Sequence, residues 1–165
     1  MKLLVLGYSQ AGKSTAAAIL AEVLHTKYLN TSDQLMKELS VELGISEECI
    51  LANKSHYRMQ LFKLGRSRQE TDPLWPQPLQ LQEADILTGL RSPDEVAAAR
   101  EHNLYDSIIW VSRDGYVAGD TDKLSPDCAD IEIKNDGDIA DLRLKLLVLI
   151  KQLQDQIEWQ ISAAR

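Results

Sequence analysis

The sequence predicts an α/β fold in which a five-stranded parallel sheet carries helices on both faces. Short apolar runs, typical of buried strands, alternate with longer amphipathic segments along the chain. This alternation favours parallel strands joined by helical crossovers, which cover both faces of the sheet. The 165 residues are sufficient for a single domain with one core, so we expect residues 1–165 to form one unit.

The first three elements come from the N-terminal part of the chain. Residues Lys2 to Leu6 form a short, continuous apolar run, which predicts a buried strand. A helix is expected from about Lys13 to His25, because four of its apolar side chains share one face. A second, short strand is expected over Thr26 to Asn30.

Two helices are expected next. Thr31 and Gln34 have the spacing of a capping box, and Gly44 would end the helix that they begin. Ser46 is placed to cap a third helix, which Gly65 would end. The two helices would therefore follow each other with only a short turn between them.

Residues 66–80 are the least regular part of the sequence. Three prolines exclude a helix interior or a central strand around them, so we expect a loop that packs on Trp75. Residues Ala84 to Thr88 form the third expected strand. The segment Ser92 to Glu95 is a strong helix start, with an N-cap serine, a proline at N1 and a glutamate at N3.

The last third of the chain supplies the remaining two strands. Residues Ser107 to Val111 form the fourth strand, and a polar loop with Gly115 and Gly119 follows. Residues Ile131 to Ile133 form the fifth strand. Asp138 is expected to cap a long final helix with an apolar stripe at helical spacing.

The segment GYSQAGKST, directly after the first strand, fits the phosphate-loop pattern G-x-x-x-x-G-K-[ST]. Gly7 and Gly12 allow the backbone to direct successive N–H groups at one phosphate. Lys13 would neutralise β- and γ-phosphate oxygens, and the Ser14 hydroxyl would ligate Mg²⁺. A buried strand before the motif and a helix after it are the context that the motif requires. We therefore expect a P-loop NTPase fold, with ATP and Mg²⁺ bound by Gly7, Ser9, Gln10, Ala11, Gly12, Lys13, Ser14 and Thr15.

Composition and charge exclude several other classes of protein. The formal net charge of −7 disfavours a nucleic-acid binder, which would need a basic surface. Cys49 and Cys128 lie far apart without metal-ligand spacing, which indicates reduced thiols in a cytoplasmic protein. We find no signal peptide and no apolar run long enough to span a bilayer, so no membrane partner is expected.

Two large classes of P-loop protein also fit poorly. A GTPase needs the guanine-reading motif N-K-x-D, and the nearest segment, Asn53 to His56, lacks the aspartate. A motor ATPase usually has an acid at the end of the third strand. Here that strand ends in Thr88-Gly89-Leu90-Arg91, so no residue is placed there to activate water.

Arginines instead follow the expected strands and surround the irregular segment. Arg91 follows the third strand, Arg113 follows the fourth, and Arg58, Arg66 and Arg68 lie near residues 66–80. Transfer of a phosphoryl group between two phosphorylated molecules needs such cations, because two anions must be brought together. The planar guanidinium suits phosphate better than the ammonium of lysine.

Three further stretches carry a resemblance to a known family. They are HYRMQLFKLGRSRQETDPLW (56–75), ADILTGLRSPDEVAAAR (84–100) and DCADIEIKNDGDIADL (127–142). With the phosphate loop, they make most of residues 1–150 similar to the phage-type deoxynucleoside monophosphate kinases. This family is related to dephospho-coenzyme A kinase among the P-loop kinases. The resemblance implies transfer of the γ-phosphoryl group of ATP to a small-molecule acceptor, a deoxynucleoside monophosphate.

The resemblance also implies roles for individual residues. The acceptor would be bound by Asp33, Arg58, Arg68, Trp75 and Arg91, with an acceptor-binding insert at about 45–80. The catalytic residues would be Lys13, Asp33, Arg91 and Arg113, with a short lid at about 113–124. Asn135 and Gly137 would lie near the adenine of ATP. Asp33 would meet the acceptor or organise a magnesium water, and Trp75 would either stack on the acceptor base or anchor its loop in the core.

One departure from the family leaves alternatives open. The family often has an aspartate where this chain has Gly89, which leaves Asp33 as the main acid. A dephospho-coenzyme A kinase would use Asp33 as a base, because its acceptor is a hydroxyl group. A nucleotide sensor without catalytic activity is the third alternative. Trp159 and the apolar stripe after residue 150 would dock a second copy in a homodimer or pack on the chain's own sheet.

Overall fold

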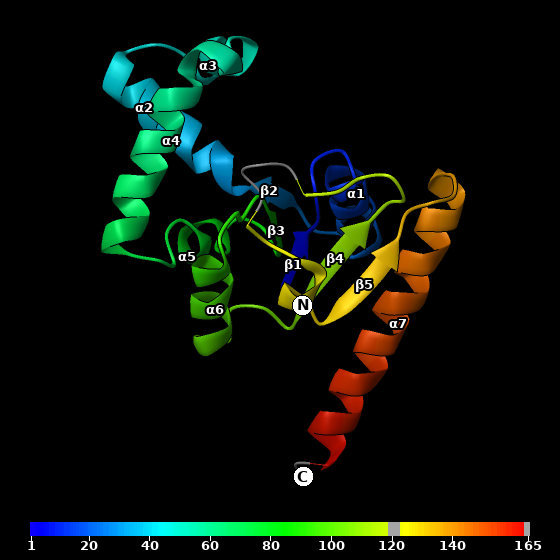
Figure 1. The fold of residues 1–165 in the computed structure, drawn as a ribbon. Helices are drawn as coiled ribbons and strands as arrows, with labels where there is room; N and C mark the ends of the chain where they lie inside the picture. Colours follow the sequence, from blue (N-terminus) through cyan, green and yellow to red (C-terminus); the bar gives the residue numbers. More distant parts are fainter. Residues whose placement is uncertain (119–122, 164–165) are drawn as a thin grey trace.

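The computed structural model describes residues 1–118 and 123–163 (Figure 1). Residues 119–122 of the expected lid, which include Gly119, lie outside the described residues. The strands are β1 (Leu3–Leu6), β2 (Tyr28–Asn30), β3 (Ile86–Thr88), β4 (Ser107–Ser112) and β5 (Ile131–Lys134). The helices are α1 (Lys13–Val23), α2 (Thr31–Leu43), α3 (Glu47–Ala52), α4 (Lys54–Thr71), α5 (Gln77–Gln80), α6 (Pro93–Glu101) and α7 (Ile139–Ala163), with a 3-10 turn η1 (Pro126–Cys128).

The five strands form one parallel sheet in the order β2-β3-β1-β4-β5. This confirms the predicted fold class. In the register of the sheet, Val5 of β1 is paired with Thr88 of β3 on one side and with Ile109 of β4 on the other. The segments that leave β1, β3 and β4 therefore start at the same edge of the sheet, where open α/β folds bind their ligands.

Helices cover both faces of the sheet because its central strands are apolar on both sides. Leu3 and Val5 of β1 belong to a core shared with α1 and α7. Leu4 and Leu6 face the opposite way and belong to a second core, which includes Val96 of α6. All four β1 residues are buried, as expected for a central strand of a parallel sheet.

Helices α2, α3 and α4 form an arm, residues 31–71, that projects from the sheet (Figure 1). The arm has a small core of its own, in which Met36 and Leu39 of α2 contact Ile50 of α3 and Leu61 of α4. The expected acceptor-binding insert at about 45–80 falls mainly in this arm and in the turn to α5. The arm is therefore held to the sheet at its two ends and packs mainly on itself in between.

The arm differs from the sequence prediction in two places. The helix expected between Ser46 and Gly65 is interrupted at Asn53, which ends α3 and precedes α4. Helix α4 then continues through Gly65 to Thr71, so the start of the expected loop at 66–80 is helical and α5 forms its end. Gly65 is buried, and a Cβ there would lie 3.3 Å from the Leu35 side chain. The glycine thus serves helix packing and does not end the helix.

Helix α7 follows the prediction closely. The Asp138 carboxylate accepts a 2.8 Å hydrogen bond from the backbone N–H of Asp141, as expected for an N-cap residue. The C-terminal half of α7 extends past the sheet (Figure 1), and Trp159 is exposed there. The expected homodimer along this helix stays a prediction. None of the helices in the described residues is both long enough and apolar enough to cross a bilayer.

Candidate nucleotide-binding site

The phosphate loop joins β1 to α1 and is shaped by residues with positive φ angles. Gly7 has φ 145°, Gln10 has φ 63° and Gly12 has φ 101°. A Cβ on Gly7 would run into the carbonyl oxygen of Val111, and a Cβ on Gly12 would run into the amide of Asn135. Glycine is therefore required at both positions for conformation and for space. The result is a backbone cradle at the N-terminus of α1, the arrangement that binds phosphate.

Asn135 supports this cradle from the end of β5. Its side chain is buried, with 9% exposed, and Nδ2 donates a 2.9 Å hydrogen bond to the carbonyl oxygen of Ala11. Its backbone N–H donates to the carbonyl oxygen of Ser112, at 2.8 Å, which fixes the residue to β4. The family resemblance implies that Asn135 lies near the adenine of ATP, and that position stays a prediction. The structure places its side chain against the loop.

Lys13, Ser14 and Thr15 follow the loop in the first turn of α1. Lys13 Nζ donates a 2.7 Å hydrogen bond to the carbonyl oxygen of Tyr8, so its ammonium group lies across the loop. The Tyr8 ring meets the Trp110 ring edge to face, with 5.0 Å between centroids, which holds the start of the loop on β4. Ser14 and Thr15 are exposed in the first turn of α1.

The residues present fit a magnesium ion that is held mainly by nucleotide phosphates. The Ser14 hydroxyl is exposed beside the cradle. At the end of β3, the Thr88 hydroxyl is buried and has no hydrogen-bond partner among the described residues. Within the described ranges no three His, Cys, Asp or Glu residues are grouped closely enough to hold a metal by themselves. Mg²⁺ commonly binds through substrate phosphates with few protein ligands, which matches this set.

The structure explains why β3 is followed by Gly89 and not by an acid. Gly89 has φ 100°, and a Cβ there would approach the Asn30 amide oxygen and come within 2.7 Å of the Thr31 hydroxyl. The polar side chains of Asn30, at the end of β2, and Thr31, at the start of α2, thus occupy the space that an aspartate at position 89 would need. Beside Gly89, the edge of the sheet that carries the phosphate loop therefore has the Asn30 amide oxygen and the Thr31 hydroxyl in place of a carboxylate.

Asp33 has a structural role at the start of α2. Its Oδ2 accepts a 2.8 Å hydrogen bond from the Asn30 backbone N–H, and Asn30 Oδ1 accepts a 2.9 Å bond from Ser32 N–H. The capping box is therefore formed by Asn30 and Asp33, and the prediction that Thr31 and Gln34 form it was wrong. Asparagine is a stronger N-cap than threonine, which accounts for the shift by one residue.

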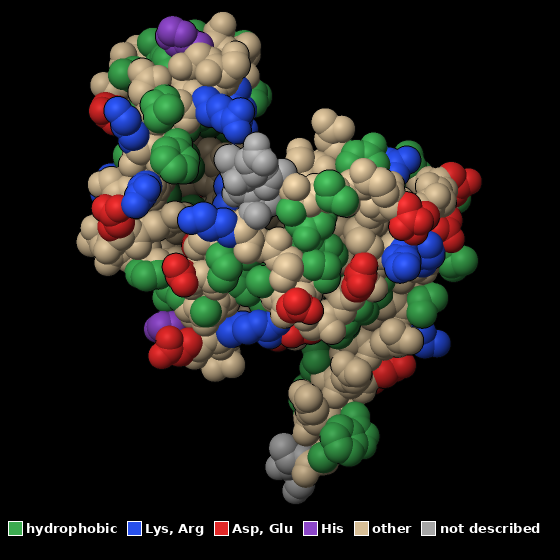
Figure 2. Space-filling view, viewed as in Figure 1, with side chains coloured by type: hydrophobic (Ala, Val, Ile, Leu, Met, Phe, Trp, Pro, Cys, Tyr) green, Lys and Arg blue, Asp and Glu red, His purple; other side chains and the backbone are tan. Residues whose placement is uncertain are grey.

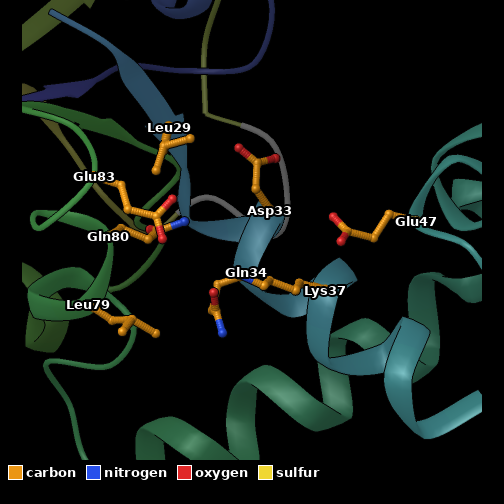
Figure 3. Close-up of a pocket in the computed structure, with 8 residues that line it drawn as sticks. All are labelled: Leu29, Asp33, Gln34, Lys37, Glu47, Leu79, Gln80 and Glu83. Carbon is orange, nitrogen blue, oxygen red and sulfur yellow. The ribbon is translucent and has the colours of Figure 1, made fainter.

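A cavity of about 220 Å³ lies beside Asp33 (Figure 3). Its lining comes from β2, α2, α3, α5 and the turn after α5: Leu29, Asp33, Gln34, Lys37, Glu47, Leu79, Gln80 and Glu83. Three carboxylates and one ammonium group give it an acidic character. A phosphate group would be repelled there, so the cavity does not fit the phosphate end of a nucleotide.

The predicted arginines fall into two groups in the structure. Arg91 and Arg113 are exposed and follow β3 and β4, and the Arg113 guanidinium lies 5.5 Å from the Tyr116 ring centroid. Arg58 and Arg68 are exposed on α4 in the arm, and Arg68 forms a 3.0 Å ion pair with Glu38. Figure 2 shows a hollow between the arm and the sheet, with Lys and Arg side chains on its rim.

Two further predicted residues have different surroundings. Trp75 is half-buried in the turn between α4 and α5, where its backbone N–H donates to Asp72 at 3.0 Å. This position favours the expectation that Trp75 anchors its segment. Gly137 lies just before α7, and a Cβ there would run into the Asp141 side chain.

The sequence identified Glu95 only as a helix cap, but the structure gives it a wider set of partners. Its Oε2 accepts hydrogen bonds from the backbone N–H groups of Arg91 (2.9 Å) and Ser92 (2.8 Å), and its Oε1 accepts from Gln69 Nε2 (2.6 Å). Only 4% of Glu95 is exposed, and this burial raises its pKa above the ordinary value. Burial also raises the pKa of the Tyr105 phenol. The long-range contact to Gln69 leaves no local signal in the sequence.

Comparison with solved structures supports the fold. Shikimate kinase from Aquifex aeolicus matches with a TM-score of 0.50 and 13% identity, over 92% of this chain and 96% of that chain. The Mycobacterium tuberculosis APS kinase CysC, solved in complex with AMPPNP and APS, matches with a TM-score of 0.54 and 18% identity. That match covers 91% of this chain and 97% of the other. No protein-family model and no curated protein sequence matches the chain. The chain therefore has the P-loop kinase fold, with the phosphate loop between β1 and α1.

Proposed function

We propose that this protein is a nucleoside monophosphate kinase that transfers the γ-phosphoryl group of ATP to a deoxynucleoside monophosphate. The observation that carries the proposal is the cradle at residues 7–15, which opens at the same sheet edge as the segments bearing Arg91 and Arg113. The P-loop kinase fold supports a phosphotransferase. The particular acceptor rests on the resemblance to the phage-type kinases.

The donor side uses the loop and the start of α1. Backbone N–H groups of the cradle and the Lys13 ammonium would bind the β- and γ-phosphates of ATP. Ser14 would contribute its hydroxyl to Mg²⁺, which when bound neutralises charge on the phosphate oxygens. Asn135 would keep the loop in its binding shape through the hydrogen bond to Ala11.

The acceptor side uses the arginines. Arg91 and Arg113 would neutralise charge on the transferring group, while Arg58 and Arg68 on the arm would hold the acceptor phosphate. An oxygen of the acceptor phosphate would attack the γ-phosphorus in line, and the bond from that phosphorus to the ADP oxygen would break. The acceptor is already an anion, so the step needs no general base. This agrees with Asp33, one of whose oxygens is engaged by a backbone N–H.

The test is ADP release from ATP and Mg²⁺ across a panel of acceptors. The panel holds each ribo- and deoxynucleoside monophosphate and dephospho-coenzyme A, with Lys13→Ala as the inactive control. We expect turnover with one or more deoxynucleotides and none with Lys13→Ala. Turnover with dephospho-coenzyme A alone would instead establish the kinase with a hydroxyl acceptor. ATP binding with no turnover on any acceptor would contradict the proposal and favour a nucleotide sensor.

A further inference from the structure

Phe62 is the only phenylalanine of the chain and lies on α4 with 62% of its surface exposed. No ring contact within the described residues includes it. The arm's own core uses Leu61 and Gly65 of α4, which are buried, and a Cβ at Gly65 would contact Leu35 of α2. Phe62 is therefore not part of the arm's own core.

The contact between Gln69 and Glu95 shows which way one stripe of α4 faces. Gln69 Nε2 lies 2.6 Å from Glu95 Oε1, and the second oxygen of Glu95 holds the backbone N–H of Arg91. The α4 stripe that contains Gln69 therefore faces the segment that carries Arg91 from the end of β3.

Helix periodicity places Phe62 on the same stripe. Phe62 precedes Gln69 by seven positions and Arg58 precedes it by eleven, which are close to two and three turns of about 3.6 residues. Arg58 and Phe62 are four positions apart, so their Cβ atoms are neighbours at about 5–6 Å. One side of the arm thus presents a guanidinium, an aromatic ring and an amide in a row. Its orientation toward the segment that carries Arg91 is given by the contact between Gln69 and Glu95.

We propose that the Phe62 ring is the platform on which the base of the acceptor nucleotide stacks, with Arg58 beside it for the phosphate. This inference rests on the proposed nucleoside monophosphate kinase function and names a further substrate contact of that site. Every base has an apolar face that stacks on an aromatic ring, so the contact tolerates different bases. It assigns the stacking role to Phe62 in preference to Trp75, which is half-buried in its turn.

The test compares an acceptor that has a base with one that lacks it. Binding of a deoxynucleoside monophosphate and of 2-deoxyribose 5-phosphate is measured by calorimetry for the wild type, Phe62→Leu and Phe62→Trp. Leu51→Ala is the matched control, because Leu51 is a similarly exposed apolar residue of the arm, with 57% exposed. We expect Phe62→Leu to weaken nucleotide binding about tenfold, or roughly 1.4 kcal/mol. Phe62→Trp should retain the affinity, and binding of the sugar phosphate should not change.

Two results would overturn the inference. One is nucleotide affinity of Phe62→Leu equal to that of Leu51→Ala. The other is an equal loss for nucleotide and sugar phosphate, which would mean that the variant alters the phosphate site. Failure of the kinase function is recognised separately, as absence of turnover in the wild type. The binding comparison still tests the stacking contact in that case, and a wild type that binds nucleotide and sugar phosphate equally would also overturn it.

Discussion

Asn135 and Ala11 are 124 positions apart, yet the Asn135 side-chain amide donates a 2.9 Å hydrogen bond to the Ala11 carbonyl oxygen. The contact joins the end of β5 to the middle of the phosphate loop. Because the Asn135 side chain also fills the space beside Gly12, it restricts the loop from two directions. The loop is thus shaped before ATP arrives, which lowers the conformational cost of binding.

The first prediction tests this support. Asn135→Ala should weaken Mg-ATP binding by about 1–3 kcal/mol, because the buried carbonyl of Ala11 loses its partner and the loop loses a side-chain contact. Calorimetric titration with ATP and Mg²⁺ measures the effect. Glu132→Ala, exposed on the same strand, controls for changes near β5. Equal ATP affinity in the two variants would show that the hydrogen bond does not shape the loop.

The second prediction concerns the acid that is missing after β3. Gly89→Asp should not create a better magnesium site and should lower the melting temperature by about 5 °C, because the new Cβ meets Asn30 and Thr31 and the φ angle is positive. Gly115→Asp is the matched control, with φ 82° and no atom within 4 Å of its Cβ position. Both variants have the cost of a positive φ, but only Gly89→Asp has the clash. The difference between their melting temperatures in thermal unfolding therefore measures the clash. The explanation fails if both variants melt at the same temperature.

The third prediction follows from the buried carboxylate of Glu95. Its pKa is raised in the folded protein, so the stability that this group contributes is complete below its ordinary pKa and is lost as pH rises through the raised value. Glu95→Gln cannot titrate, so its unfolding free energy relative to the wild type should increase from pH 4 to pH 8. Urea unfolding at several pH values measures this slope. Glu101→Gln, an exposed acid of the same helix, corrects for the change in net charge, and a relative slope of zero or of opposite sign would contradict the prediction.

The fourth prediction separates the arm from the sheet. Gln69→Met removes the hydrogen bond to Glu95 but keeps a side chain of similar length. We expect faster amide exchange at Arg91 and in the last turn of α4, and about a tenfold higher KM for the acceptor with little change in the KM for ATP. Gln60→Met, exposed on the same helix, is the control. A result identical to that control would mean that the contact does not position the arm.

Much of the fold could be predicted from the sequence, because its signals are local. The buried run at β1, the loop with Gly12 and Lys13, and the caps at Ser92 and Asp138 depend on neighbouring residues alone. The arm was predicted less well, since Gly65 has the same appearance in the sequence whether it ends a helix or allows a close helix contact. Only its burial against Leu35 distinguishes the two.

The sequence by itself determined the parallel sheet, the phosphate loop and the order of the elements, because strand and helix periodicity and glycine stereochemistry act over a few residues. The tertiary structure decided which distant groups complete the site: Asn135 at the loop, Asn30 and Thr31 beside Gly89, and Gln69 with Glu95 between the arm and the sheet. These contacts depend on how the strands are ordered and how the arm leaves the sheet. Both are settled by long-range packing of apolar faces, and no local pattern encodes them.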